Sequence, residues 1–155
     1  MLFWNGLKDI ETGIAEIDHQ HRKFFELMNA LLQLGIEGTE QDKLLKSLIM
    51  MRSYIRYHFS LEEDLMLEAR YPQYKEHISA HRYFKDQIRI MGSMFEDQNE
   101  PAKVLITRYN YMLVEWFLRH IKVMDKSMSA YFLDYKEKHK GFLGKMKEIL
   151  SRPFA

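Results

Sequence analysis

The sequence predicts an all-α fold: an up-down-up-down antiparallel four-helix bundle with an N-terminal arm and a short C-terminal helix. Three observations predict it. Four stretches carry apolar residues at alternating steps of three and four, the spacing that keeps side chains on one helix face. The breaks between them contain Gly35, Gly38, Pro72 and Pro101 and leave only short loops, which make neighbouring helices antiparallel. No stretch shows the alternation of a β-strand.

Each predicted helix has one stripe of residues that faces the core. In the first helix the stripe is Ile17, His21, Phe24, Met28 and Leu31. In the second it is Leu44, Leu48, Met51, Ile55, His58, Glu62 and Leu65. In the third it is Tyr74, His77, His81, Phe84, Ile88, Met91 and Phe95. In the fourth it is Ile106, Tyr109, Leu113, Trp116, His120 and Val123.

The whole chain, residues 1–155, is predicted to form one domain, because a chain of this length can bury a core of its own. Residues 17–135 form the predicted bundle, and Asp18 is the predicted N-cap of its first helix. Residues 1–16 form an arm whose expected packing anchors are Trp4, Ile10 and Ile14.

Residues 136–155 form a predicted basic amphipathic tail. Gly141 is the expected helix stop. The short helix after it has an apolar side made of Phe142, Leu143, Met146, Ile149 and Leu150. The tail carries six Lys or Arg residues against two Glu. A solvated outer face is the favoured interpretation of this charge, and binding to a membrane surface or to a protein partner is the alternative.

The composition excludes several classes of protein. There are 23 Lys and Arg against 22 Asp and Glu, a net charge of +1, whereas a nucleic-acid-binding protein shows a basic excess. The absence of cysteine excludes disulfides, thiolate metal sites and a cysteine nucleophile. No run approaches the ~18 apolar residues of a membrane span. Because the first residues also lack the features of a secretory signal, we expect a cytoplasmic protein.

Histidines are the most informative residues of the chain. Five of the seven lie in the core stripes: His21, His58, His77, His81 and His120. A single histidine on a core face is more often a hydrogen-bonded structural residue than a ligand. Five of them with Glu62 need a common partner, because each buried polar group left unpaired costs ~1–3 kcal/mol and a carboxylate costs more. His19 and His139 lie outside the stripes and are expected at the surface.

These six side chains are expected at one depth of the bundle. At ~1.5 Å of rise per residue, counting from the loops brings them to roughly the same level of the antiparallel helices. The pair His58 and Glu62 and the pair His77 and His81 are each four residues apart, so both members can reach one centre. We therefore expect all six to surround one buried site.

The spacing of Asp125 does not place it in this cluster as readily as the spacing of Glu62 does. It follows His120 by five residues, over which an ideal helix turns by ~140°. By periodicity alone it is a surface acid, and only a local bulge, or a second metal reached from the side, would bring it into the cluster.

The donor set indicates which metals fit. Imidazole with carboxylate suits iron, copper, zinc or nickel, whereas magnesium and calcium prefer oxygen. The set is too large for one tetrahedral zinc and suits two metals bridged by carboxylates. The core stripes lack the Glu-x-x-His motif of ferritin-like di-iron proteins. A zinc-protease motif is excluded because Ile78 stands where that motif has its catalytic base.

Four segments closely resemble the hemerythrins, specifically the bacterial hemerythrin domains. They are Ile17-Asp18-His19-Gln20-His21, His58-Phe59-Ser60-Leu61-Glu62-Glu63, His77-Ile78-Ser79-Ala80-His81 and Trp116-Phe117-Leu118-Arg119-His120-Ile121-Lys122-Val123-Met124-Asp125. The resemblance spans roughly residues 4–133 and includes all seven ligand positions of the family in order.

This resemblance implies a cofactor of two non-haem iron ions, Fe2+ or Fe3+, bridged by an oxo or hydroxo group. The implied ligands are His21, His58, Glu62, His77, His81, His120 and Asp125. The last three histidines would saturate one iron, and the first two would hold the other, which keeps one open position. Both carboxylates would bridge the irons, since the family places its aspartate five residues after the histidine.

The function implied is reversible binding of dioxygen, for storage, delivery or buffering, by a protein that is not an enzyme. A dry pocket protects such a complex, and its expected lining is Phe24, Phe59, Trp116, Phe117 and Ile121. Ordinary core packing explains these five residues equally well. Asp18 and Gln20 are candidates for outer hydrogen bonds to the ligands, with helix capping and solvent exposure as equal alternatives.

Three other functions remain as alternatives. The same di-iron site could act as an enzyme on nitric oxide or peroxide. The chain could also be an oxygen or redox sensing module that contacts a partner through its arm or basic tail. A structural bundle loaded with zinc is the weakest alternative, because seven convergent ligands exceed what structural zinc needs.

Overall fold

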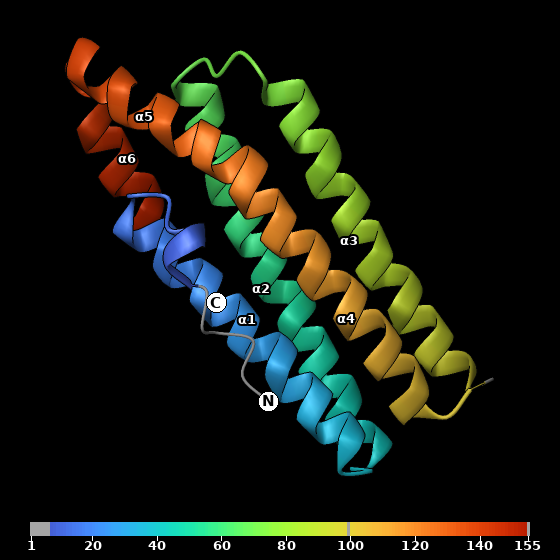
Figure 1. Cartoon of the computed structure of the whole chain (residues 1–155). Coiled ribbons are helices and arrows are strands. Elements are labelled where there is room, and N and C mark those ends of the chain that lie inside the picture. The colour runs from blue at the N-terminus through green and yellow to red at the C-terminus, as the bar shows by residue number, and fades with distance from the viewer. Residues whose placement is uncertain (1–6, 99, 155) are drawn as a thin grey trace.

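A computed structural model of the chain describes residues 7–98 and 100–154. Four long helical segments follow a short 3-10 helix, and a short helix ends the chain (Figure 1). In order, the elements are η1 (Leu7–Ile10), α1 (Ala15–Ile36), α2 (Gln41–Glu68), α3 (Tyr74–Asp97), α4 (Ala102–His120), η2 (Ile121–Asp125), α5 (Lys126–Lys138) and α6 (Phe142–Leu150). The described part of the chain contains no β-strand.

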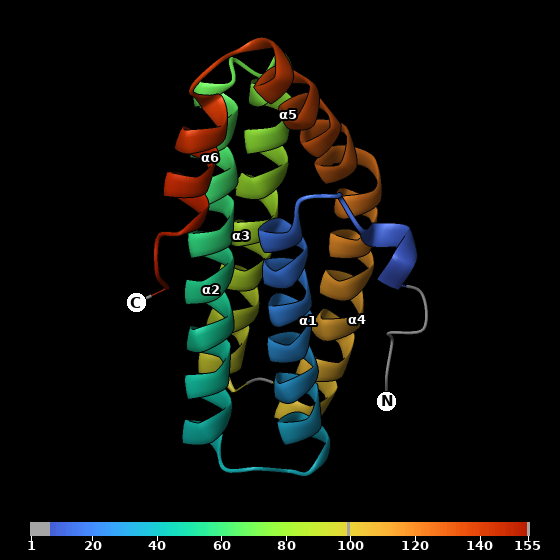
Figure 2. The same ribbon diagram turned by 90° about the vertical axis from the view of Figure 1, so that its left-hand side faces the viewer.

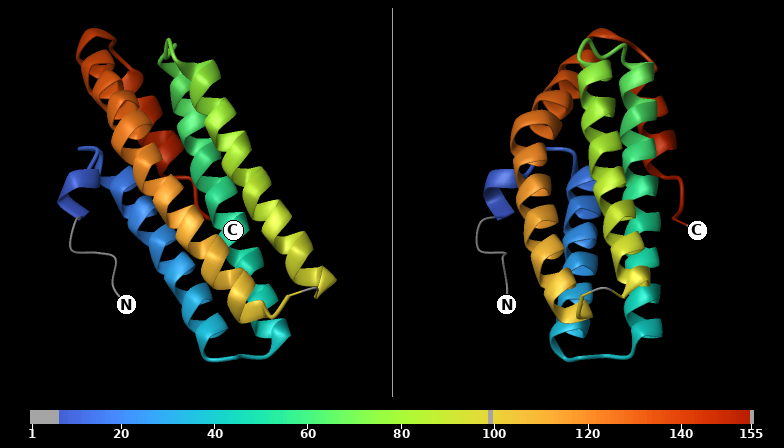
Figure 3. Two further views of the ribbon diagram at one scale, coloured as in Figure 1. Left: turned by 45° about the vertical axis from the view of Figure 1, so that its right-hand side comes forward. Right: turned by 90° about the vertical axis from the view of Figure 1, so that its right-hand side faces the viewer.

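The long helices form the predicted antiparallel four-helix bundle. Helix α1 packs against α2 and α4, and α3 packs against the other sides of the same two helices. Figure 3 shows the four helices side by side, each reversing the direction of the one before it. The fourth helical segment is a continuous run of α4, η2 and α5, and its α5 end continues past the start of α1 (Figure 1).

The core consists of two apolar clusters with a polar layer between them. One cluster fills the half of the bundle that holds the loop between α1 and α2, and it includes Phe24, Phe59 and Phe117. The other lies at the end covered by α5 and α6, and it includes Ile17, Leu65 and Phe132. Along each helix the buried histidines and carboxylates fall at the boundary between these clusters. The buried histidines and carboxylates therefore lie in a single layer of the bundle.

The predicted stripes of the first three helices are confirmed. Their members are buried, except that Tyr74 is half-buried. The fourth stripe is wrong at its end, because Val123 is 63 % exposed and Asp125 is 0 % exposed.

The π-helix η2 causes this difference. A π-helix bonds residue i to residue i+5, so side chains five residues apart lie on the same side of it. Residues Ile121–Asp125 form this turn, which directly follows His120. The extra residue turns Val123 outward and Asp125 inward. The local bulge that the spacing of His120 and Asp125 required is thus present.

The N-terminal arm closes one side of the bundle. Ile10 and Ile14 are buried as expected, and η1 contacts η2, whereas Trp4 lies outside the described residues. The predicted N-cap at Asp18 is wrong, because α1 begins at Ala15 and has Ile14 at its N-cap. The Asp18 carboxylate instead accepts bonds from the backbone N–H and the hydroxyl of Thr12, at 2.8 and 2.7 Å. It ties the arm to the first turn of the helix.

The C-terminal helix folds back along α2, as Figure 2 shows. Gly141 permits the reversal, since its φ of +93° is in the left-handed region where glycine is favoured. The apolar side of α6, apart from the exposed Leu143, is buried in the core. The Tyr57 hydroxyl donates a hydrogen bond to the Arg152 carbonyl at 2.6 Å, and Arg152 pairs with Asp64. The basic side chains of Lys145 and Lys147 remain exposed.

One buried hydrogen bond joins α1 to α4. Asn110 is 3 % exposed, and its amide donates to the Met28 carbonyl at 2.6 Å. Asn110→Ala removes this bond and leaves a small cavity, so we expect the free energy of unfolding to fall by ~1–3 kcal/mol in urea titrations. Glu115→Ala, at an exposed site on the same helix, should change it by less than about 0.5 kcal/mol. Equal effects of the two substitutions would contradict this role of Asn110.

Candidate metal centre

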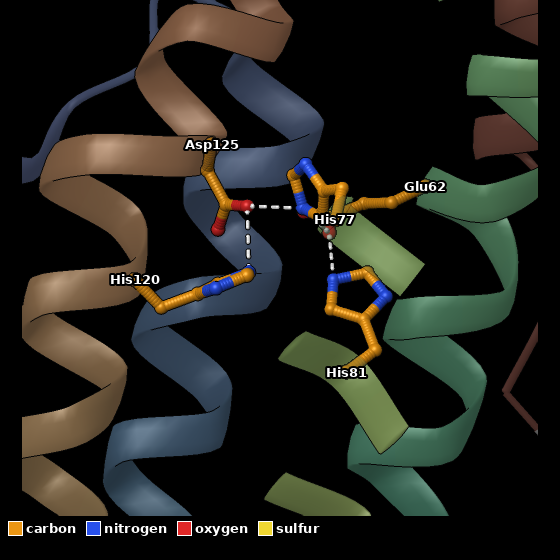
Figure 4. A group of neighbouring side chains, drawn as sticks. All are labelled: Glu62, His77, His81, His120 and Asp125. Carbon is orange, nitrogen blue, oxygen red and sulfur yellow. Dashed lines mark ion pairs between the residues drawn. The ribbon is translucent and has the colours of Figure 1, made fainter. Parts of the chain in front are cut away.

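The seven residues predicted as metal ligands converge on one buried cluster. Five of them, from α2, the first turns of α3, the end of α4 and the end of η2, form one group: Glu62, His77, His81, His120 and Asp125. Figure 4 shows their polar ends pointing toward one another from α2, α3 and the fourth helical segment. Asp125 Oδ1 lies 3.0 Å from the Nε2 atoms of both His77 and His120. Glu62 Oε2 lies 3.2 Å from His81 Nε2.

A second group shares the two carboxylates with the first. It consists of His21, His58, Glu62 and Asp125. Here the opposite oxygens are used: Glu62 Oε1 lies 2.9 Å from His58 Nε2, and Asp125 Oδ2 lies 3.1 Å from His21 Nε2. Each carboxylate therefore presents one oxygen to each group of histidines, which is the arrangement of two bridging ligands between two neighbouring sites.

The cluster is closed to water and lacks internal hydrogen bonds. All seven side chains are between 0 and 4 % exposed. None of the five Nε2 atoms and none of the four carboxylate oxygens has a hydrogen-bond partner, although several lie within 3.2 Å of one another. These nitrogen and oxygen atoms thus face common centres. Buried polar groups left unpaired cost ~1–3 kcal/mol each, and metal ions at those centres would satisfy all of them together.

This donor set fits transition metals. Neutral imidazole with carboxylate suits iron, copper, zinc and nickel. The group of five donors is too rich for a structural zinc, which takes four ligands, and the group of four donors shares both of its carboxylates with the other group. Two bridged ions fit the arrangement better than one.

Two histidines are held from behind by outer hydrogen bonds. His58 Nδ1–H donates to Gln20 Oε1 at 2.7 Å, and His81 Nδ1–H donates to Glu63 Oε1 at 2.9 Å. A proton on Nδ1 leaves Nε2 free to bind a metal, so these bonds select the ligating tautomer. Gln20 is 1 % exposed, which excludes the solvent-exposed alternative for this residue.

Glu63 was missed by the sequence reasoning. The only feature of the sequence that could have pointed to Glu63 is its position next to Glu62. Because a helix turns by ~100° per residue, the side chain of Glu63 is directed away from that of Glu62. Whether it faces a neighbouring helix or water depends on the rotation of α2, which the stripe pattern determines only approximately. His19 and His139 are exposed, as expected.

The carboxylates of Glu62 and Asp125 are ionised, and their negative charges stabilise positive charge on neighbouring groups. Burial raises the pKa of Asp125, but His120, His21 and His77 outweigh it and bring this pKa well below its ordinary value. The pKa of Glu62 is lowered well below its ordinary value in spite of burial and Asp125, because His58 and His21 lie close.

The histidines respond to the same charges in opposite ways. Burial lowers the pKa of His21, but the adjacent Asp125 and Glu62 carboxylates more than compensate and raise it to about 9. Burial dominates at His58, where the pKa falls below its ordinary value. Without a metal, His21 therefore holds a proton that partly balances the two carboxylates.

Aromatic rings surround the two groups differently. On the five-donor side, rings lie flat on imidazoles: Phe59 stacks on His81 with centroids 3.7 Å apart, and Trp116 stacks on His120 at 4.7 Å. Both imidazole planes are fixed by this contact.

On the four-donor side, an edge contact replaces stacking. The Phe117 ring meets His21 at 5.5 Å and 89°. Phe24 and Phe25 pack against Phe117 at 4.9 and 5.1 Å. Ile121 is also fully buried, in the same apolar cluster. Apolar atoms therefore cover this side without occupying a face of its imidazoles.

A small cavity touches the four-donor side. It has a volume of about 10 Å³ and is lined by Ile10, Glu11, Asp18, His21 and Arg22. It lies between the arm and α1, and its size is about that of one water molecule.

Comparison with known proteins agrees with the cluster. Relatives named bacteriohemerythrin match most of the chain. The one from Stenotrophomonas maltophilia is 28% identical over 153 residues, which is 94% of this chain and 94% of that protein. The one from Pseudomonas paraeruginosa is 30% identical over 120 residues, 76% of this chain and 73% of that protein. The one from Clostridium acetobutylicum is 27% identical over 131 residues, 81% of this chain and 97% of that protein.

The sequence model of one family, described as the hemerythrin HHE cation binding domain, matches residues 12–132. That range contains every residue of the cluster and most of the bundle. The chain therefore belongs to the hemerythrin family.

Proposed function

We propose that this protein binds dioxygen reversibly at a pair of non-haem iron ions held by the seven-residue cluster. The observation that carries the proposal is the unequal division of donors. Glu62 and Asp125 serve both groups, but three histidines join one group and only two join the other. Two like metals in such a site would differ by one protein ligand. The metal held by only two histidines would therefore keep one coordination position open for a small molecule.

Each ligand has a distinct role in this proposal. His77, His81 and His120 complete one metal site, and His21 with His58 form the incomplete one. Ferrous iron would supply the electrons with which dioxygen is held. Because only two of the ligands are anionic, the shell leaves positive charge on a metal pair and so favours its reduced state.

The surrounding rings support binding without turnover. Phe117 and Phe24 cover the incomplete site with apolar atoms, which exclude water and the side reactions that water brings. The cavity beside His21 admits only a very small ligand. Phe59 and Trp116 stack on His81 and His120, so we assign them to holding these two imidazoles in place, and Phe59 also lies against His58.

We further propose that the protein stores, delivers or buffers oxygen in the cytoplasm and is not an enzyme. Once the seven cluster residues are assigned as ligands, no other acid–base pair is left at the cluster to serve catalysis. No helix in the described part of the chain is long and apolar enough to cross a membrane.

The proposed function is tested by visible spectroscopy of the reduced, iron-loaded protein. Air should produce a charge-transfer band that argon removes, through repeated cycles. His21→Ala should abolish the band while the thermal melt still shows a folded protein, because this substitution removes one of only two histidines at the incomplete site. His19→Ala, at an exposed position on the same helix, should leave the band unchanged.

Two results would contradict this function. One is reversible oxygenation that persists in His21→Ala. The other is steady consumption of a reductant with nitric oxide or peroxide, which would identify an enzyme instead.

Metal affinity should depend on pH in a defined direction. His21 has a pKa of about 9 in the metal-free protein and must lose its proton to bind a metal. Rising pH removes that proton, so affinity should increase from pH 6.5 toward pH 9, by up to about tenfold per pH unit at the incomplete site. Cobalt(II) titrations of the metal-free protein at several pH values would measure it. An affinity that is constant or falls over this range would contradict the protonation state assigned to His21.

A further inference from the structure

A basic groove runs between α2 and α3, outside the metal cluster. Its cations come from both helices: Arg52 and Arg56 from α2, and Arg82, Lys85 and Arg89 from α3. The groove has a volume of about 600 Å³. The two helices lie side by side in Figure 3, right.

Most of this positive charge is uncompensated. Asp86 is the one acidic residue in the lining, and it pairs with Arg89 through a 2.9 Å contact. Within the described part of the chain, Arg52, Arg56 and Arg82 form no ion pair. Like charges held close on rigid helices repel one another, so an anionic ligand would relieve this repulsion as well as form new ion pairs.

The shape of the groove favours a protein over a small anion. Small-molecule sites are concave and bury most of their ligand's surface. Here Arg52, Arg56 and Arg82 are exposed, and Arg89 is 64 % exposed. Successive cations on α3 extend over about 10 Å of helix, from Arg82 to Arg89. Two such rows fit a segment that carries several carboxylates in sequence, which guanidinium groups bind in a bidentate manner.

The groove also lies next to the metal cluster. Tyr83, part of its lining and 52 % exposed, packs against Trp116 with centroids 6.3 Å apart. Trp116 in turn stacks on His120. A partner bound in the groove would therefore be separated from a cluster histidine by two ring contacts.

We propose that this basic groove is the docking surface for an acidic segment of a partner protein. Electrostatic docking of this kind steers association and is weakened by salt. The basic tail, which was the surface expected to bind a partner, is the competing site. The apolar side of α6, apart from Leu143, is buried within the molecule, and Lys145 and Lys147 are exposed.

Fluorescence anisotropy with the full iron-loaded protein tests this proposal. The probe is a short fluorescein-labelled peptide rich in glutamate. The double variant Arg56→Glu, Arg82→Glu should weaken its binding by about tenfold or more at low salt, because two cations of the groove become anions. The matched control is Lys145→Glu, Lys147→Glu on α6, which changes the net charge equally and should alter binding by no more than about twofold. Thermal melts establish that both variants are folded, as all four side chains are exposed.

Three outcomes would overturn the proposal. Equal weakening in both variants would show a response to net charge only, and weakening in the tail variant alone would move the site to α6. Pyrophosphate or ATP that displaces the peptide and binds the groove more tightly would show a site for small anions instead. Because peptide binding involves no gas, failure here leaves the proposed oxygen binding standing, and failure of oxygen binding leaves this result interpretable.

Discussion

The burial of seven ionisable side chains in one layer is the constraint on which this structure depends. Five imidazoles and two carboxylates lie between two apolar clusters, and their facing atoms have no hydrogen-bond partners. A layer of this kind opposes folding unless something satisfies it, since a buried unpaired charge costs several kcal/mol. The bundle, the outer hydrogen bonds to the histidines and the rings stacked on them all serve to hold this layer in one geometry.

A single backbone irregularity completes the cluster. If α4 continued as a regular helix, Asp125 would be turned ~140° away from His120 and the shared carboxylate would be lost from both groups. The π-helix η2 brings the two residues to the same side, and Asp125 then presents one oxygen to each group. A π-helical turn is less stable than a regular helical turn, and metal binding by the cluster would offset this loss of stability. Such turns often occur at functional sites.

Much of this could be predicted from the sequence, because the apolar stripes record which helix face is buried. The four-helix bundle, and the common depth of the five core histidines and Glu62 along its axis, followed from the apolar periodicity and the positions of the loops. The inward position of Asp125 did not, since periodicity assumes a regular helix, and the same assumption wrongly placed Val123 in the core. Whether the side chains of Gln20 and Glu63 face a histidine or water depends on small rotations of their helices about the helix axis, which the sequence pattern does not determine. The division of rings between the two sides of the cluster depends on packing between helices that one-dimensional patterns do not record.

The measurement that tests the central claim most directly is the stoichiometry of ferrous iron bound by the metal-free protein, with its unfolding temperature followed at each addition. A cluster built to share its carboxylates between two ions should take up two per chain, and each should raise the unfolding temperature, because binding to the folded state adds to its stability. Uptake of a single ion, or an unfolding temperature that iron does not change, would contradict the account.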